Sequence, residues 1–163
     1  MTSILKVSEI QDPANSNSAL SINSSGVVTN PQKPHVNVDM GGTGAYLSHS
    51  ANDVLKFDTV FDGDASLFNT STYKFTCPVD GIYMATAVVL LQSEENVSLY
   101  FYINSTFQYH SFNSLNRRAS AVSVAKCSAG DEIYFTSSNN TGYWDGSAAG
   151  GGRYSHGSFT LIG

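Results

Sequence analysis

Residues 73–91 read YKFTC-PVDG-IYMATAVVLL, two apolar runs joined by four turn-forming residues. Both runs are rich in β-branched and aromatic side chains, which favour strands. In the joining segment, Pro78 fixes φ and the Asp80-Gly81 pair tolerates the backbone conformations of a tight turn. We therefore predict a β-hairpin with strands at 73–77 and 82–91. The second strand is apolar on both faces, so one face should pack on the core and the other needs a second cover.

The composition is typical of one globular domain that faces the outside of a cell or particle. The 163 residues are 41% hydrophobic, which is enough for the core of a single domain. Only 13% are charged, so neutral polar residues must solvate most of the surface, as in an all-β extracellular or virion protein. The net charge is −5 and Arg117-Arg118 is the only basic cluster, which argues against nucleic-acid binding.

Targeting signals and cysteines indicate the cellular compartment in which the chain is made. Residues 1–7 lack the pattern of a signal peptide, and no segment has the roughly 18 uncharged apolar residues that cross a bilayer. We therefore expect a soluble protein made in the host cytoplasm, with no membrane partner. Cys77 and Cys127 form no zinc-binding pattern, so we predict two buried thiols, with a single disulfide as the less favoured alternative.

The chain divides into two parts. Strand-like runs at 4–10, 19–22 and 27–28 are too short and too few to bury a core, so this part needs sister copies or a larger body to pack against. Pro31 and Pro34 then stiffen a linker. We predict a docking segment with its linker at residues 1–33 and a globular domain at residues 34–163.

The second part contains strand candidates separated by turn signals, and nothing with helical periodicity. The candidates are 35–40, 54–61, 73–77, 82–91, 97–103, 107–112, 119–127, 132–137 and 158–162. Short strands at this spacing predict an all-β sandwich or jelly roll. Residues 97–103 are again apolar on both faces. Two such strands predict an aromatic patch that a monomer would leave exposed and that an oligomer would bury.

Four motifs resemble one known family. FTCPVDGIY at 75–83 resembles the F-T-C-x-x-P-G-x-Y-Y-F motif of the complement 1q globular head, a relative of tumour necrosis factor. Residues 99–104, 129–135 and 157–163 are similar to later strands of that family in the same order, so the resemblance covers 34–163. In the first motif the proline lies ahead of the turn, and the last motif lacks an internal glycine.

This resemblance implies a ten-stranded jelly roll that forms a homotrimer through aromatic-rich strands around a threefold axis. The residues that we expect at the trimer interface are Tyr83, Val89, Tyr100, Tyr102 and Tyr134.

The N-terminal part reads MTSILKV at 1–7, IQD at 10–12 and LSINSSGVV at 20–28. This run resembles the opening of structural proteins of tailed bacteriophages, notably phages of marine bacteria and cyanobacteria. In those proteins such a segment precedes fibre-like or knob-like domains. The resemblance implies a protein on the outer surface of the virion that docks on capsid or tail proteins through residues 1–30. Release by lysis would explain an outward-facing composition without a signal peptide.

Catalytic and metal-binding patterns are weak. The chain has no G-x-S-x-G elbow, H-E-x-x-H motif, Walker loop or dinucleotide fingerprint, and its four histidines are far apart in sequence. We therefore predict a protein that is not an enzyme and needs no cofactor. Asp62 and Asp64 flank a glycine and could offer oxygen ligands to Ca²⁺, as in relatives of the family, although a plain turn is the favoured interpretation.

The loop at 137–156 is the best candidate for a receptor site. It contains the only tryptophan on a glycine-rich backbone, and aromatic faces beside hydrogen-bonding groups suit a glycan or protein receptor. Alternatively, Trp144 covers the end of the sandwich. The candidate residues are Tyr143, Trp144, Asp145, Arg153, Tyr154 and His156.

Three functions remain open. The first is a trimeric fibre or knob protein that attaches the virion to the host surface. The second is a capsid decoration or head-fibre protein, because a short anchor with a knob serves both purposes. The third, a hydrolase of surface glycans, is disfavoured by the missing catalytic motifs.

Overall fold

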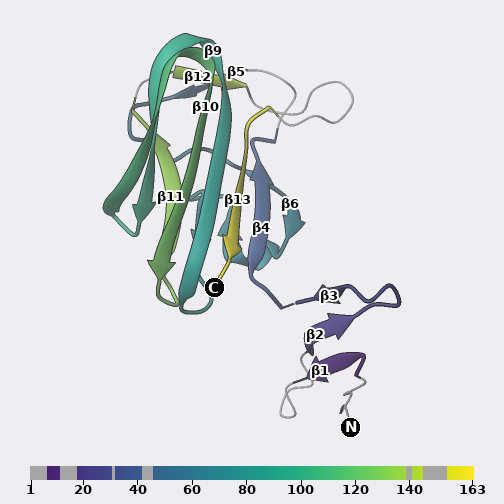
Figure 1. Ribbon diagram of the computed structural model, residues 1–163. Helices are drawn as coiled ribbons and strands as arrows, with labels where there is room; N and C mark the ends of the chain where they lie inside the picture. The colour runs from purple at the N-terminus through teal and green to yellow at the C-terminus, as the bar shows by residue number, and fades with distance from the viewer. Residues whose placement is uncertain (1–6, 12–17, 31, 42–45, 139–140, 145–153) are drawn as a thin grey trace. The chain divides into compact units, whose positions relative to one another are not determined.

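The computed structural model describes residues 7–11, 18–30, 32–41, 46–138, 141–144 and 154–163 (Figure 1). The chain forms two compact units, residues 1–33 (unit 1) and residues 34–163 (unit 2).

Unit 1 is a small antiparallel sheet with the strand order β1 (Glu9–Gln11), β2 (Ser18–Ile22) and β3 (Val28–Thr29). Asn23 ends β2, and its side-chain oxygen accepts hydrogen bonds of 2.9 Å from the backbone N–H groups of Ser25 and Val27. The sheet has no buried core among its described residues, and its large apolar side chains stay exposed. These include Ile10, Leu20, Ile22, Val27 and Val28.

Unit 2 is built of strands, and a single short 3-10 turn is the only helical element among its described residues. The elements are β4 (His35–Asp39), β5 (Tyr46–His49), β6 (Thr59–Gly63), η1 (Ala65–Leu67), β7 (Phe68–Asn69), β8 (Lys74–Thr76), β9 (Gly81–Ile103), β10 (Thr106–Cys127), β11 (Glu132–Ser137), β12 (Thr141–Trp144) and β13 (His156–Leu161). The predicted all-β class is confirmed.

The two long strands, β9 and β10, connect the two layers of unit 2, and Figure 1 shows them bending together. Before the bend, residues 81–91 of β9 pair with β13 and with residues 118–127 of β10; β4 and β6 complete this layer, sheet I. After the bend, residues 97–103 of β9 pair with β11 and with residues 106–113 of β10; β7 and β8 complete sheet II.

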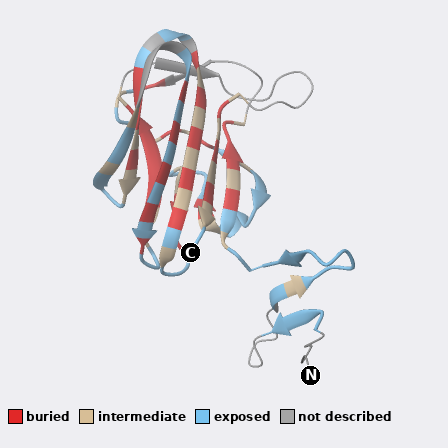
Figure 2. Cartoon of the chain, viewed as in Figure 1, coloured by how far each residue is buried: buried red, intermediate tan, exposed pale blue. Residues whose placement is uncertain are grey.

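The core lies between the two sheets and is dominated by aromatic rings. Phe159 of sheet I stacks on Phe75 of sheet II, with ring centroids 5.4 Å apart and an interplanar angle of 6°. The rings of Phe68 and Phe135 lie 5.7 and 6.2 Å from that of Phe159. Figure 2 shows buried residues alternating with intermediate ones along β9 and with exposed ones along β10, as expected for a sandwich with one face in the core.

The predicted hairpin at 73–91 is wrong. β8 pairs with β7 and β11, whereas β9 pairs with β10, β11, β12 and β13, so residues 78–80 cross from one sheet to the other. Asp80 accepts a hydrogen bond of 2.8 Å from the backbone N–H of Ala129, and the Tyr83 hydroxyl donates one of 2.9 Å to the carbonyl of Val79. Gly81 does not adopt the positive φ that a tight turn would use. A glycine fits at this position because a Cβ atom would overlap the side chain of Leu161.

Other strand boundaries also differ from the prediction. The segment predicted at 54–61 is a strand only from Thr59 onward, because Leu55 and Phe57 reach into the core from a backbone that follows no ladder. Val54 contributes one isolated bridge to Thr136. Four predicted strands merge pairwise into β9 and β10, and β5, β7 and β12 were not predicted.

Both cysteines are buried and free, as favoured from the sequence. Cys77 follows β8 and Cys127 ends β10. Burial raises the pKa of both thiols, so both stay protonated and poorly reactive at neutral pH.

Candidate functional site

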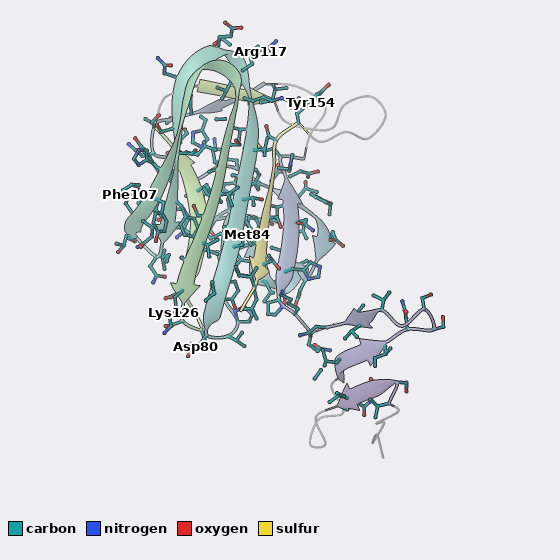
Figure 3. The ribbon with its side chains drawn as sticks, viewed as in Figure 1. Asp80, Met84, Phe107, Arg117, Lys126 and Tyr154 are labelled. Atoms are coloured by element: carbon teal, nitrogen blue, oxygen red, sulfur yellow. The ribbon has the colours of Figure 1, made fainter. Side chains whose placement is uncertain are left out.

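The outer face of sheet I carries an apolar strip that the single chain does not cover. The strip consists of Ile82, Met84 and Val88 on β9 with Val122 and Val124 on β10, and Figure 3 labels Met84 on the part of β9 before the bend. Val122 is 70% exposed, Val124 47% and Ile82 44%, while Met84 and Val88 are half-buried. The alternate residues of both strands point into the core, so one face of β9 is covered from within and the other needs a partner.

Strand β10 adds a second unsatisfied feature beside the strip. It pairs only with β9 among the described strands, so one edge of this 22-residue strand is open. An open edge exposes unpaired N–H and C=O groups that invite association with another chain. The strip and the adjoining part of this edge, residues 118–127, together form a surface suited to another subunit.

The outer face of sheet II carries a different surface, which we call the aromatic patch. Ser98, Tyr100 and Tyr102 alternate along β9, and Phe107 and His110 lie opposite them on β10. These five residues line an open hollow of about 430 Å³. The ring of Phe107 contacts those of Tyr100, Tyr102 and His110 at centroid distances of 5.7, 5.9 and 6.2 Å.

An ion pair lies beside Tyr134, which adjoins the aromatic patch. Tyr134 of β11 stacks on Tyr102, with centroids 5.3 Å apart and an interplanar angle of 5°. Lys74 lies 4.8 Å above the Tyr134 ring and binds Glu132 at 2.8 Å. Burial raises the pKa of Tyr134, so its phenol stays neutral. The pair thus adds no net charge, and the hollow itself is lined by uncharged groups and His110.

The five expected interface residues fall into two groups. Tyr83 and Val89 are completely buried in the core of the single chain, so assigning them to a trimer interface is wrong: neither has surface left for a partner. Tyr100, Tyr102 and Tyr134 lie together on sheet II, and their assignment to an interface stays a prediction.

The expected receptor residues are only partly described. Tyr143 and Trp144 lie on β12, opposite Leu47 and Tyr46 of β5, and the description there extends to the backbone alone. Asp145 and Arg153 lie outside the described residues.

The other two receptor candidates precede or begin β13. Tyr154 is half-buried and lies, in Figure 3, near the end of unit 2 marked by Arg117. His156 pairs with Asp39 and Val88 within sheet I. The structure therefore does not gather the six candidates into one described site.

The two carboxylates considered for calcium have local structural partners. Asp62 accepts a hydrogen bond of 2.8 Å from the side chain of Asn37. Asp64 caps the 3-10 turn, accepting bonds from the N–H and hydroxyl of Ser66 at 2.9 and 2.6 Å, and these bonds lower its pKa. Among the described residues, no group of three or more His, Cys, Asp or Glu could hold a metal ion.

His49 and Ser137 form a pair that resembles part of a catalytic site but is closed to substrate. His49 Nε2 lies 3.1 Å from the carbonyl oxygen of Val54, and Nδ1 lies 3.2 Å from the Ser137 hydroxyl. Since a carbonyl only accepts, Nε2 carries the proton and the hydroxyl donates to Nδ1. Both residues are buried, so the hydroxyl cannot attack a substrate.

This pair predicts a pH dependence of stability. Desolvation lowers the pKa of His49 below 6.5, so between that folded pKa and pH 6.5 the unfolded chain binds more protons. The free energy of unfolding should be highest above pH 6.5 and fall as the pH falls through this window. Urea unfolding between about pH 7 and 5 measures it. His49→Gln should flatten the slope and exposed His110→Gln should not; equal slopes in both variants would contradict the assignment.

Sequence analysis missed Ser98, Phe107 and His110 as members of a site. Their strands were predicted, but the face each side chain occupies depends on the register of β9 with β10 and on its shift between Phe107 and Tyr109. These residues could have been found by noting that positions 98, 100 and 102 alternate and so share one face, and by pairing that face with the next predicted strand.

Comparisons with known proteins agree with this architecture. The model of the C1q domain family matches residues 42–157, more than half of the chain. The globular domain of zebrafish complement 1qA is 20% identical, with a TM-score of 0.53 over 81% of this chain and 98% of that chain. Murine APRIL is 10% identical, with a TM-score of 0.59 over 80% and 100%. The TNF protein Eiger of S. frugiperda is 10% identical, with a TM-score of 0.57 over 80% and 93%. No curated protein sequence matches the chain.

Proposed function

Because the chain belongs to the C1q domain family, we propose that it is a trimeric, non-enzymatic surface protein of a tailed-phage virion that helps the particle attach to its host. In this proposal unit 2 is an outward-facing knob and unit 1 anchors it to capsid or tail proteins.

The apolar strip of sheet I is the observation that carries the trimer. It combines Val122 and Val124 with the open edge of β10, a surface that a soluble monomer would leave to water. Domains of the C1q and tumour necrosis factor families form homotrimers. In a homotrimer of this chain, each of the three subunits would bury its own apolar strip against a neighbouring subunit.

Unit 1 supports the anchor. Its three strands leave apolar side chains exposed, so it gains stability by packing against something else. Together with its resemblance to the opening of phage structural proteins, this favours docking on a virion. No helix among the described residues is long and apolar enough to cross a membrane.

Deletion of residues 1–33 is expected to leave unit 2 folded and trimeric but unable to join the particle. The two units are separate compact bodies, so the cut removes none of the core between sheets I and II. Thermal unfolding and light scattering of the truncated chain measure the first half, and its copy number on purified virions measures the second. Truncated protein that decorates virions at normal copy number would refute the anchor.

Attachment itself is tested by competition. Excess full-length protein should slow adsorption of the parent phage to its host cells by occupying receptors, whereas a Val122→Asp monomer should compete less well because it binds through one site instead of three. Labelling the protein on intact particles gives an independent answer. Label at the tail tip favours attachment. Label at regular capsid positions, together with no slowing of adsorption by the added protein, would refute attachment and favour capsid decoration.

A further inference from the structure

The aromatic patch on sheet II has the construction of a ligand site. Its residues come from two paired strands, so the backbone that carries them is held by the sandwich. The hollow of about 430 Å³ lies within the range of pockets that bind small molecules, roughly 300–1,000 Å³. It is open, as suits one unit of a longer chain better than an enclosed cofactor.

The side chains of the patch combine flat apolar faces with hydrogen-bonding groups. Phe107 is 48% exposed, and Tyr100 and Tyr102 are half-buried, so all three rings reach the hollow with part of their surface. Within the described part of the chain, neither the two phenol hydroxyls nor the His110 nitrogens make a hydrogen bond. These groups are available to bond a ligand.

The electrostatics of the hollow favour a neutral ligand. Among the described residues, no Lys, Arg, Asp or Glu lines it, and the Lys74–Glu132 ion pair beside Tyr134, with its atoms 2.8 Å apart, adds no net charge. A phosphate, a sulfate or an acidic peptide would find no fixed countercharge there. A neutral ligand that fits must offer an apolar face to the rings and hydroxyls to the polar groups.

Sugars have this combination, since a pyranose presents a face of C–H groups together with ring hydroxyls. We propose that the aromatic patch binds a neutral hexose unit of a host surface glycan, with Phe107 and Tyr100 contacting the sugar face and His110, Ser98 and the phenols bonding its hydroxyls. This rests on the proposed attachment function and moves the receptor site from the loop at 137–156 to sheet II. The patch stays open in the trimer proposed above, because the apolar strip lies on the other sheet.

Saturation-transfer NMR with methyl glycosides tests the site on the full-length protein. The probes are the methyl glycosides of glucose, galactose and N-acetylglucosamine at millimolar concentration, with methyl α-sialoside as the charged comparison. At least one neutral glycoside should bind, and Phe107→Ala and Tyr100→Ala should each weaken it about tenfold or more. Tyr100→Phe, which removes only the hydroxyl, should weaken it by a smaller factor.

Tyr109→Ala is the matched control. Tyr109 is 53% exposed on the same strand, but it stacks on Phe101 and does not line the hollow. It should bind like the unchanged protein, and all variants should keep their oligomeric mass and melt within about 4 °C of the unchanged protein. Equal binding by Phe107→Ala and Tyr109→Ala would overturn the site. Binding of the sialoside alone, or of no glycoside, would overturn the ligand class.

Adsorption competition separates this proposal from the attachment function. If no glycoside binds but the protein still competes with the phage, and competition survives periodate oxidation of host glycans, then attachment stands and the sugar site falls in favour of a protein receptor. In the opposite case, a glycoside binds and Phe107→Ala abolishes that binding, but the protein does not slow adsorption of the phage. The sugar site then stands and the attachment function is refuted.

Discussion

Phe159→Ala is expected to lower the free energy of unfolding by about 3–5 kcal/mol, the usual cost of removing a buried phenylalanine. Phe159 is 1% exposed and lies where the two sheets meet. Its ring stacks on Phe75 at 5.4 Å and touches Phe68 and Phe135, so truncation on sheet I leaves a cavity lined by three rings of the opposite sheet II. Those rings belong to β-strands that cannot move inward without breaking their pairing.

Urea unfolding at fixed protein concentration measures this cost, because the stability of an oligomer depends on concentration. Phe107→Ala is the control, since it removes the same side chain from an exposed position and should cost about 1 kcal/mol or less. Similar costs for the two variants would contradict the assignment of Phe159 to the core.

Local patterns predicted two strands of unit 2 well. Residues 132–137 and 35–39 form strands close to the predicted limits, because both runs are rich in β-branched or aromatic residues. Burial alternates at Val36 and Val38, whereas residues 133–137 are all buried. Leu55 and Phe57 also alternate, but the backbone there bonds to Phe135 and to itself without joining a ladder. Hydrophobic alternation reports burial, and hydrogen-bonded pairing is a separate property that depends on distant residues.

The hairpin prediction at 73–91 failed for a related reason. Pro78 and Gly81 are compatible with a tight turn, but Phe75 and Tyr83 both belong in the core, with ring centroids 5.8 Å apart. A hairpin would place the two strands side by side in one sheet. The chain instead sends them to opposite sheets, where both rings are buried. Turn chemistry permits several connections, and core packing selects one.

The candidate surfaces were only partly predictable. The sequence indicated that two strands need an additional cover, and both uncovered faces exist: the apolar strip on sheet I and the aromatic patch on sheet II. Which residues occupy each face depends on the phase of the alternation. Tyr83 and Val89 point inward because Ile82 and Val88 point outward. A shift of one residue exchanges the two sets, and residue composition does not determine that shift.

Val122→Asp is expected to convert the proposed trimer into monomers at micromolar concentration. Val122 is 70% exposed in the single chain, so the domain itself should tolerate the change with a loss of about 1 kcal/mol or less. In the trimer the same position would be buried beside Val124 and Met84. Three carboxylates would then lose their hydration among apolar side chains, at several kcal/mol each. Light scattering should give the mass of one chain in place of three, and the melting temperature should fall because assembly no longer stabilises the fold.

Val79→Asp is the matched control for this variant. Val79 is 43% exposed and lies between β8 and β9 at residues 78–80, the end of unit 2 marked by Asp80 in Figure 3, away from the centre of the strip at Met84. The control adds the same charge to an exposed valine, so it should keep the mass of the trimer. Dissociation by both variants would indicate a general effect of added negative charge on a chain of net charge −5. A trimer that survives Val122→Asp but dissociates on Tyr102→Asp would place the subunit interface on sheet II, which would also close the aromatic patch to glycans.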